Sequence, residues 1–273
     1  LREAGIDPDV VAGTSMGAVV GACDLAGRLD RLETFARDLT PRGVFGLLDL
    51  RLGGSGLVGG ERLARLIVSH LDDVRIEDLA RPFTAVATEL ATGHEIWLTT
   101  GRLVEALRAS YALPGIFEPV RLGRRLLVDG ALVNPVPVSV CRALGAEVVI
   151  AVNLASDTLA RGTVVQAPPI EIPADPDDRP HDRIGRGLLR RFFAGTADAP
   201  GLTGVMMESF NIIQDRITRS RLAGDPPDVM IAPRLGRIGL FDFHRAAEAI
   251  DIGRAAADRA LPELVERLGE TTR

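Results

Sequence analysis

The sequence contains no lysine, so all 32 of its Lys and Arg positions are arginine. An arginine side chain stays protonated in proteins and cannot accept the proton of a nucleophile, which excludes a serine hydrolase with a lysine base. Only four histidines can supply an imidazole base, namely His70, His94, His181 and His244. A catalytic base in this chain is therefore expected to be one of these histidines or a carboxylate.

Cysteine is also scarce. Cys23 and Cys141 stand among small or apolar residues, which is the setting of buried free thiols in a reducing compartment rather than of a disulfide framework. No C-x-x-C pair and no clustered His/Cys spacing predicts a metal site. We therefore expect no metal site.

Two further absences narrow the range of partners. The formal net charge is −5, which provides no electrostatic basis for binding nucleic acid. No apolar run reaches the ~18 residues that a membrane span needs, and the first residues lack the basic and apolar regions of a signal peptide. These features favour a cytoplasmic protein without a nucleic-acid partner, whose contacts with membranes are transient and peripheral.

Strand-like and helical segments alternate along the chain, and 46% of its residues are hydrophobic. This alternation predicts that residues 1–273 form a single α/β domain with a mainly parallel sheet. Residues 147–154 are almost wholly apolar, which is typical of a strand covered on both faces. The other expected strands are 9–14, 83–90, 95–99, 120–122, 126–128 and 229–232, and the expected helices are 16–26, 29–39, 61–71, 103–109, 138–144 and 243–268.

Two segments interrupt this pattern. Residues 42–60 are rich in glycine and loop-like. Residues 156–200 are rich in proline and charge and cannot bury enough apolar surface to offset their ordering entropy, so a mobile surface excursion is expected. Within it, residues 183–193 mix arginine with aromatic and aliphatic side chains. They are interpreted either as a short helix with solvated arginines or as a lid that touches an anionic lipid surface.

A G-x-S-x-G motif begins at Gly13 and is preceded by β-branched residues and followed by small ones. In a nucleophile elbow, a sharp turn between a strand and a helix exposes the serine and leaves no room for side chains beside it, which accounts for Gly13 and Gly17. The helix N-terminus favours developing negative charge. The motif therefore predicts Ser15 as a nucleophile, with Thr14 and Met16 completing the elbow.

A serine hydroxyl is a weak nucleophile and needs a positioned base. Asp129 follows the apolar run L-L-V and precedes Gly130 and Ala131. A carboxylate at the end of an apolar strand is partly desolvated, which raises its affinity for a proton. Asp-Gly is also ordinary turn chemistry, and the residues alone leave both interpretations open.

Several motifs, in this order, resemble the patatin-like phospholipases of bacteria. The elbow G-T-S-M-G-A is followed by A-S-Y-A-L-P-G-I-F-E-P-V at 109–120 and by V-D-G-A-L-V-N-P-V-P at 128–137, and 83–90 and 227–231 also fit. The resemblance covers nearly the whole chain outside 156–200. It implies a three-layer α/β/α fold and a hydrolase of lipid acyl esters that needs no cofactor. Ser15 matches the family nucleophile and Asp129 the family base, which implies a Ser-Asp dyad and an acyl-enzyme intermediate.

One part of the family pattern has no counterpart. The family carries a G-G-G-x-R/K-G loop upstream of its elbow, and backbone N–H groups of that loop form the oxyanion hole. Here the elbow begins a few residues after Leu1, so we expect a chain that lacks this loop and the family's first strand. The backbone N–H of Met16 is then the expected oxyanion donor. The other glycine-rich segment, 53–60, is either a flexible connection or a substitute anion cradle.

Two alternatives to a serine lipid hydrolase stay open. His244 follows Ser15 and Asp129 in the chain order of the α/β-hydrolase triad, although its place at the start of a long helix is more typical of a cap. The missing oxyanion loop favours instead a catalytically silent protein that only binds lipid.

Overall fold

The computed structural model describes residues 1–43, 56–58, 71, 74–156, 201–239 and 242–271. The chain divides into two compact units, one formed by Leu1–Thr158 with Ile213–Arg273 and the other by Leu159–Ile212. The predictions for the excursion, for the segment 183–193 and for a helix over 61–70 lie outside the described residues. All of the contacts described below belong to the first unit.

Five strands form the central sheet, in the order β1-β3-β7-β6 with β4 also paired to β3. β1 and β3 are parallel, whereas β4 and β7 are both antiparallel to β3, and β6 is antiparallel to β7. The sheet is therefore mixed rather than mainly parallel. The strands are β1 (Val11–Thr14), β3 (Phe83–Glu89), β4 (Glu95–Leu98), β6 (Val120–Leu122) and β7 (Arg125–Asp129).

Short connections account for the antiparallel pairs, because a strand that returns through a tight turn runs against its neighbour. β6 and β7 are joined at Gly123, whose φ of 59° is one that glycine adopts readily. β3 and β4 are joined near Gly93, with a φ of 70°. The hairpin around Gly123 agrees with the sequence pattern. The antiparallel pairing of β3 with β7 joins segments distant in the chain, so local pattern cannot predict it.

Two further pairs of strands are parallel. β8 (Ile150–Val152) pairs with β9 (Val229–Ile231), and β2 (Gly56–Val58) pairs with β5 (Gly115–Phe117). β2 lies in the glycine-rich segment for which the sequence predicts a loop, and the sequence does not predict β5. β8 is shorter than the predicted strand 147–154, and two apolar residues, Val152 at its end and Leu154 after it, are about half exposed. The covering that an apolar run predicts is therefore incomplete here.

The helices of the described residues mostly begin and end close to where the sequence predicts them. Gly5, with a φ of 71°, is the C-cap of the first short turn, a position that favours glycine. The sequence does not predict a helix over 202–224, because its apolar residues do not follow a clear helical period. In the structure several of these apolar residues are exposed. The helices are α1 (Met16–Leu25), α2 (Leu29–Arg37), α5 (Leu103–Ser110), α6 (Val138–Ala143), α8 (Leu202–Gly224) and α9 (Ala246–Thr271), with 3-10 turns η1 (Arg2–Ala4), η2 (Ile76–Asp78), η3 (Gly130–Leu132) and η5 (Phe243–Arg245).

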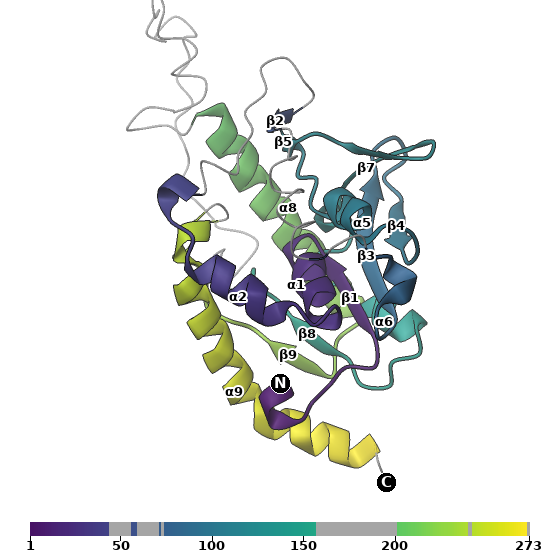
Figure 1. The fold of residues 1–273 in the computed structure, drawn as a ribbon, viewed down its shortest axis with the longest axis vertical. Coiled ribbons are helices and arrows are strands. Elements are labelled where there is room, and N and C mark those ends of the chain that lie inside the picture. The colour runs from purple at the N-terminus through teal and green to yellow at the C-terminus, as the bar shows by residue number, and fades with distance from the viewer. Residues whose placement is uncertain (44–55, 59–70, 72–73, 157–200, 240–241, 272–273) are drawn as a thin grey trace, which may run out of the picture. The chain divides into compact units, whose positions relative to one another are not determined.

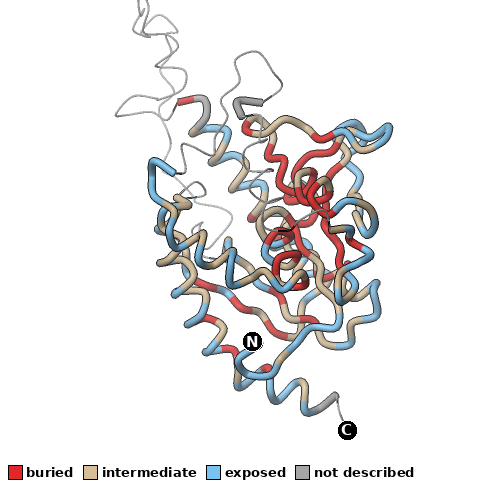
Figure 2. Tube along the Cα trace, in the orientation of Figure 1, coloured by how far each residue is buried: buried red, intermediate tan, exposed pale blue. Residues whose placement is uncertain are grey.

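Helices cover both faces of the central sheet, which confirms the three-layer α/β/α architecture (Figure 1). Phe83 and Ala85 of β3 pack against α1 and α5 in the main hydrophobic core. Alternate side chains of a strand point to opposite faces, so the Thr14 side chain lies on the other face, where its hydroxyl donates to the Asn134 carbonyl just before α6. Figure 2 shows the buried residues concentrated along β3, β7 and the helices packed on them.

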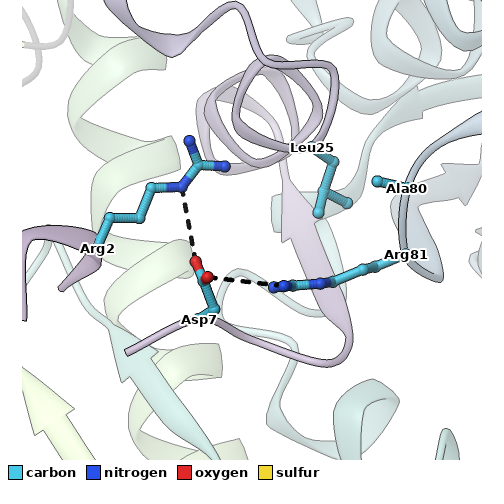
Figure 3. A pocket seen from close by; sticks show the side chains of 5 residues that line it. All are labelled: Arg2, Asp7, Leu25, Ala80 and Arg81. Atoms are coloured by element: carbon cyan, nitrogen blue, oxygen red, sulfur yellow. Dashed lines mark ion pairs between the residues drawn. The ribbon is translucent and has the colours of Figure 1, made fainter. Parts of the chain in front are cut away.

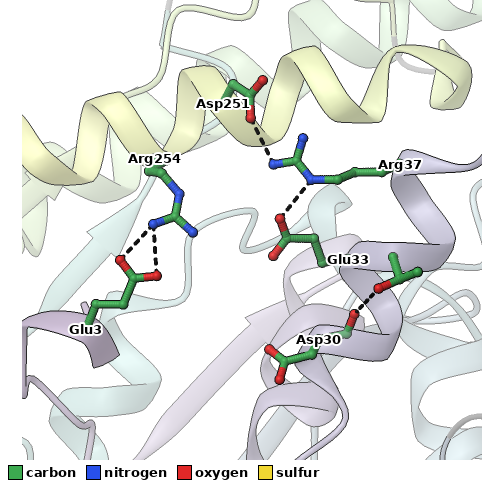
Figure 4. Close-up of polar contacts among 7 residues, drawn as sticks. Glu3, Asp30, Glu33, Arg37, Asp251 and Arg254 are labelled. Carbon is green, nitrogen blue, oxygen red and sulfur yellow. Dashed lines mark hydrogen bonds and ion pairs between the residues drawn. The ribbon is translucent and has the colours of Figure 1, made fainter.

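Ion pairs link the N-terminal segment and α2 to the last helix. Glu3 contacts Arg254 at 2.7 Å, and Arg37 contacts both Asp251 and Glu33 at 2.8 Å (Figure 4). Such exposed pairs are screened by water and contribute little to stability. The stronger support for α9 is apolar, because its buried residues pack on the β8–β9 sheet.

Candidate active site

Ser15 is the single residue between β1 and α1, and its backbone is strained. It has φ 53° and ψ −125°, and it is the one non-glycine residue with positive φ in the described part of the chain. A conformation of this kind costs about 1–3 kcal/mol and persists only where surrounding contacts hold it. The Ser15 carbonyl accepts hydrogen bonds from the N–H groups of Ala18 and Val19, at 3.0 and 3.2 Å, which begins the helix.

The two glycines of the motif differ in what surrounds them. A Cβ on Gly13 would lie 2.5 Å from the Ala18 backbone nitrogen, so β1 and α1 approach too closely there for any side chain. A Cβ on Gly17 would meet nothing within 4 Å. The expectation that crowding explains both glycines is therefore right for Gly13 and wrong for Gly17, which faces open space at the start of α1.

Asp129 is the last residue of β7, and only 2% of its surface is exposed. The Ser15 Oγ donates a hydrogen bond to Asp129 Oδ2 at 2.8 Å, across 114 positions of sequence. The other oxygen, Oδ1, accepts from the Ala131 N–H at 2.8 Å. The Asp129 backbone is held as well, because its N–H donates to the Ala112 carbonyl and its carbonyl accepts from the Thr88 hydroxyl, both at 2.9 Å.

Burial raises the pKa of Asp129 from 3.8 to about 7, because ionising a carboxyl away from water is unfavourable. The hydrogen bonds from the Ala131 N–H and the Ser15 hydroxyl oppose this rise, since they stabilise the carboxylate. A group that titrates near neutral pH can both accept and return a proton. The desolvation expected for a carboxylate at the end of an apolar strand is confirmed and is nearly complete.

Gly130 allows the strand end to approach β3. A Cβ there would lie 2.3 Å from the Val86 carbonyl oxygen, closer than any real side chain comes. The chain then turns into η3, for which the Asp129 side chain is the N-cap through its bond to Ala131. Gly130 and Ala131, the two residues of the expected Asp motif, thus let Asp129 reach Ser15 and hold its second oxygen.

Ser110, the last residue of α5, contacts the elbow directly, although the sequence assigned it no role. Its Oγ accepts a hydrogen bond from the Ser15 backbone N–H at 2.9 Å and donates one to the Val86 carbonyl at 2.7 Å. Ser110 is completely buried. The one available signal was its place in the A-S-x-A-x-P stretch that the chain shares with a known family.

The turn after η3 supports the elbow from the other face of the sheet. The Asn134 carbonyl accepts from the Thr14 hydroxyl at 2.7 Å, and the Asn134 amide donates to Glu95 Oε1 at 2.9 Å. Arg221 of α8 donates to the second oxygen of Glu95 at 3.0 Å. The residue before Ser15 is therefore anchored to a polar network that runs from the buried Asn134 to Arg221 at the surface.

Met16 begins α1, so its backbone N–H belongs to the first turn, where an α-helix has no carbonyl of its own to offer. This N–H points out of the same helix end on which the Ser15 hydroxyl lies. A negatively charged oxygen is favoured at such a position. This position suits Met16 as an oxyanion donor. Of the glycine-rich segment 53–60, which is the other candidate for binding an anion, only β2 at 56–58 is described.

Two of the four candidate histidines lie within the described residues, and both are exposed. His244 is exposed in η5, and His94 is exposed with its Nδ1 2.8 Å from the Thr92 hydroxyl. His70 and His181 are outside the described residues. Cys23 and Cys141 are both free, as expected, and the expected burial holds for Cys23, whereas Cys141 is only partly buried.

A surface pocket of about 280 Å³ is lined by Arg2, Asp7, Leu25, Ala80 and Arg81. Figure 3 shows both arginines directed at Asp7, at 3.8 and 3.7 Å, so the one carboxylate of this pocket is shared between two arginines. It contains neither Ser15 nor Asp129.

Within the described ranges, no group of three or more His, Cys, Asp or Glu residues is arranged to hold a metal ion. None of the described helices combines the length and apolar character needed to cross a bilayer.

Comparison with known proteins places the same segments in a family. The family model described as patatin-like phospholipase matches residues 1–142. An uncharacterized NTE family protein of Mycobacterium tuberculosis is 33% identical, over 96% of this chain and 85% of the relative. A second such protein of that organism is 32% identical, over 97% of this chain and 44% of its own length. Patatin-like phospholipase domain-containing protein 7 of Rattus norvegicus is 34% identical over 57% of this chain and 12% of its own length.

Proposed function

This chain belongs to the patatin-like phospholipase family, and on that premise we propose that it hydrolyses acyl esters of lipids with Ser15 as the nucleophile and Asp129 as the base. Membership supports lipid hydrolysis in general. The choice of residues, the dyad and the acyl-enzyme intermediate are our proposal, which the family motifs imply and the geometry of the site supports.

The observation that carries the proposal is the hydrogen bond of 2.8 Å from Ser15 Oγ to Asp129 Oδ2. It joins a strained residue at a helix N-terminus to a buried carboxyl whose pKa is raised to about 7. A nucleophile within hydrogen-bond reach of a base that a further group orients is the arrangement that activates a hydroxyl. Here the Ala131 N–H is the orienting group, because it holds the other oxygen of Asp129.

The reaction then has two halves. Ionised Asp129 accepts the hydroxyl proton as Ser15 Oγ attacks the ester carbonyl, and the Met16 N–H faces the oxygen that becomes negative. Collapse of this intermediate breaks the ester bond, and the departing alcohol takes the proton from Asp129, leaving an acyl-enzyme. Asp129 next accepts a proton from water, which attacks the acyl group and releases the fatty acid, and Ser15 recovers its proton.

The direct contact supports a dyad over the triad that would use His244. In a triad the imidazole lies between the serine and the carboxylate, whereas here Ser15 Oγ and Asp129 are already hydrogen-bonded. His244 is exposed at the start of the last helix. Asp129 therefore serves as the base itself in the proposed reaction.

The test is covalent labelling of the protein with a fluorophosphonate probe, together with turnover of a short-chain aryl ester. The wild type is expected to react at one site, and Ser15→Ala is expected to abolish both labelling and turnover. Ser220→Ala removes an exposed hydroxyl on α8 and serves as the matched control. Labelling that survives Ser15→Ala would refute the nucleophile, and a folded wild type that binds lipid vesicles without reacting would favour the lipid-binding alternative.

A further inference from the structure

The hydroxyl of Ser110 lies between the elbow and the middle of the sheet. It accepts a hydrogen bond from the Ser15 N–H at 2.9 Å and donates one to the Val86 carbonyl at 2.7 Å. A hydroxyl has one donor and two acceptor positions, so the bond to Val86 orients a lone pair toward Ser15. Because Ser110 has no exposed surface, solvent does not compete for either bond.

Ser110 holds the one part of the Ser15 backbone that the strand and the helix leave unheld. The ladder between β1 and β3 ends at the pair Thr14 and Val86, so the next N–H, that of Ser15, lies beyond it. The Ser15 carbonyl is already engaged by the first turn of α1. Rotation about the N–Cα bond sets φ, and the bond to Ser110 restrains the peptide plane from which that rotation is measured.

The Val86 carbonyl is a common reference for both members of the dyad. Ser110 is bonded to it, and the Gly130 Cα approaches it so closely that a Cβ would lie 2.3 Å away. Gly130 directly follows Asp129. One point on β3 therefore sets the position of the serine backbone through Ser110 and of the carboxyl through Gly130.

We infer that Ser110 is a positioning residue for the proposed hydrolysis: its hydroxyl transfers the position of β3 to the Ser15 backbone and so directs Ser15 Oγ at Asp129. Ser110 touches the Ser15 N–H and not Oγ, so it takes no part in proton transfer. The inference rests on the proposed function, since it assigns a role within that site.

The experiment compares Ser110→Ala with wild type in steady-state ester hydrolysis, at matched folded fraction. We expect kcat to fall about 10- to 100-fold, because small displacements of a reacting group are costly, with KM changed less than about twofold. The kcat/KM profile should also move to higher pH, because the hydrogen bond from Ser15 lowers the pKa of Asp129 and would be weakened. Ser110→Cys keeps a weak donor and acceptor and should recover part of kcat.

Thr84→Val is the matched control. Thr84 is equally buried in β3, and its hydroxyl has no partner among the described residues, so its loss should leave kcat unchanged. A kcat for folded Ser110→Ala within about threefold of wild type would overturn the positioning role. An equal loss of kcat in Thr84→Val would also overturn it, because the loss would then follow from removing any buried hydroxyl and not from the contact between Ser110 and Ser15.

Amide hydrogen exchange separates this inference from the proposed function. The Ser15 amide is expected to exchange faster in Ser110→Ala than in wild type, while the amides of β3 away from Val86 keep their protection. An inactive, unlabelled wild type would refute the proposed function, and the Ser110 contact would then be judged by exchange alone. Unchanged exchange at Ser15 would overturn it in either case.

Discussion

Replacing Asp129 by asparagine removes the proposed base while keeping its shape. The amide of the variant can still accept from the Ala131 N–H with its oxygen and face Ser15 with its nitrogen, so the contacts at 2.8 Å on either side can persist. An amide cannot take the serine proton at neutral pH. Turnover of an aryl ester by Asp129→Asn is therefore expected to fall about 10²- to 10⁴-fold, the usual contribution of a general base.

The same variant should be more stable than the wild type at alkaline pH. The folded pKa of Asp129, about 7, lies above its ordinary value of 3.8, so the folded protein binds this proton more tightly than the unfolded chain does. The stability that this group contributes is present in full below about pH 4 and is lost as the pH rises to about 7. Three pKa units correspond to about 4 kcal/mol. Asparagine does not titrate, so the free energy of unfolding of Asp129→Asn, relative to that of the wild type, should increase between about pH 4 and about pH 7.

Urea unfolding of both proteins at about pH 4 and about pH 8 measures this difference. Asp30→Asn changes an exposed carboxylate on α2 and controls for surface charge. In parallel, wild-type kcat/KM should rise with pH and level off above about 7, because the base must be ionised to act. Wild-type turnover in Asp129→Asn would refute the assignment of the base, and a variant less stable than wild type at alkaline pH would refute the desolvation argument.

Three other outcomes are expected. Gly13→Ala should lower the free energy of unfolding by about 1–3 kcal/mol or more, because the new Cβ would meet the Ala18 backbone. Gly17→Ala should raise the free energy of unfolding by up to about 1 kcal/mol, because alanine favours a helix. Equal urea midpoints for the two variants would contradict the packing at these two glycines. His244→Ala should retain most of the ester turnover, and its loss in a protein with an unchanged melting curve would restore the triad. Glu3→Gln should leave the urea midpoint nearly unchanged even at low salt, because its pair with Arg254 is exposed; a large shift would show that this contact anchors α9.

The sequence predicted the parts of the site that depend on the local backbone. A nucleophile elbow needs glycine where the strand meets the helix, and Gly13 is required there by a contact only five positions along the chain, with Ala18. The hairpin at Gly123 and the C-cap at Gly5 follow from the same short-range preference for positive φ. These features are visible in the order of residues because the partners that demand them are neighbours in the chain.

Other parts of the fold depend on pairing across long stretches of sequence, and local pattern predicted them poorly. β7 joins β3 antiparallel, which makes the sheet mixed, and nothing within either segment specifies the other. β5 and the long helix α8 were missed because their apolar residues do not repeat with a clear period. Gly17 was expected to be crowded, and only the folded chain shows that nothing lies beside it.

By itself, then, the sequence determined the two candidate residues, Ser15 from its elbow motif and Asp129 from the resemblance of its surroundings to a known family. Tertiary structure decided their relation: the 2.8 Å between them, the burial that raises the pKa of Asp129 to about 7, and the Ser110 bridge to β3. The physical reason is that desolvation and hydrogen-bond geometry depend on what surrounds an atom in space. For this pair those surroundings come from β3, α5 and β7, segments that meet only when the chain is folded.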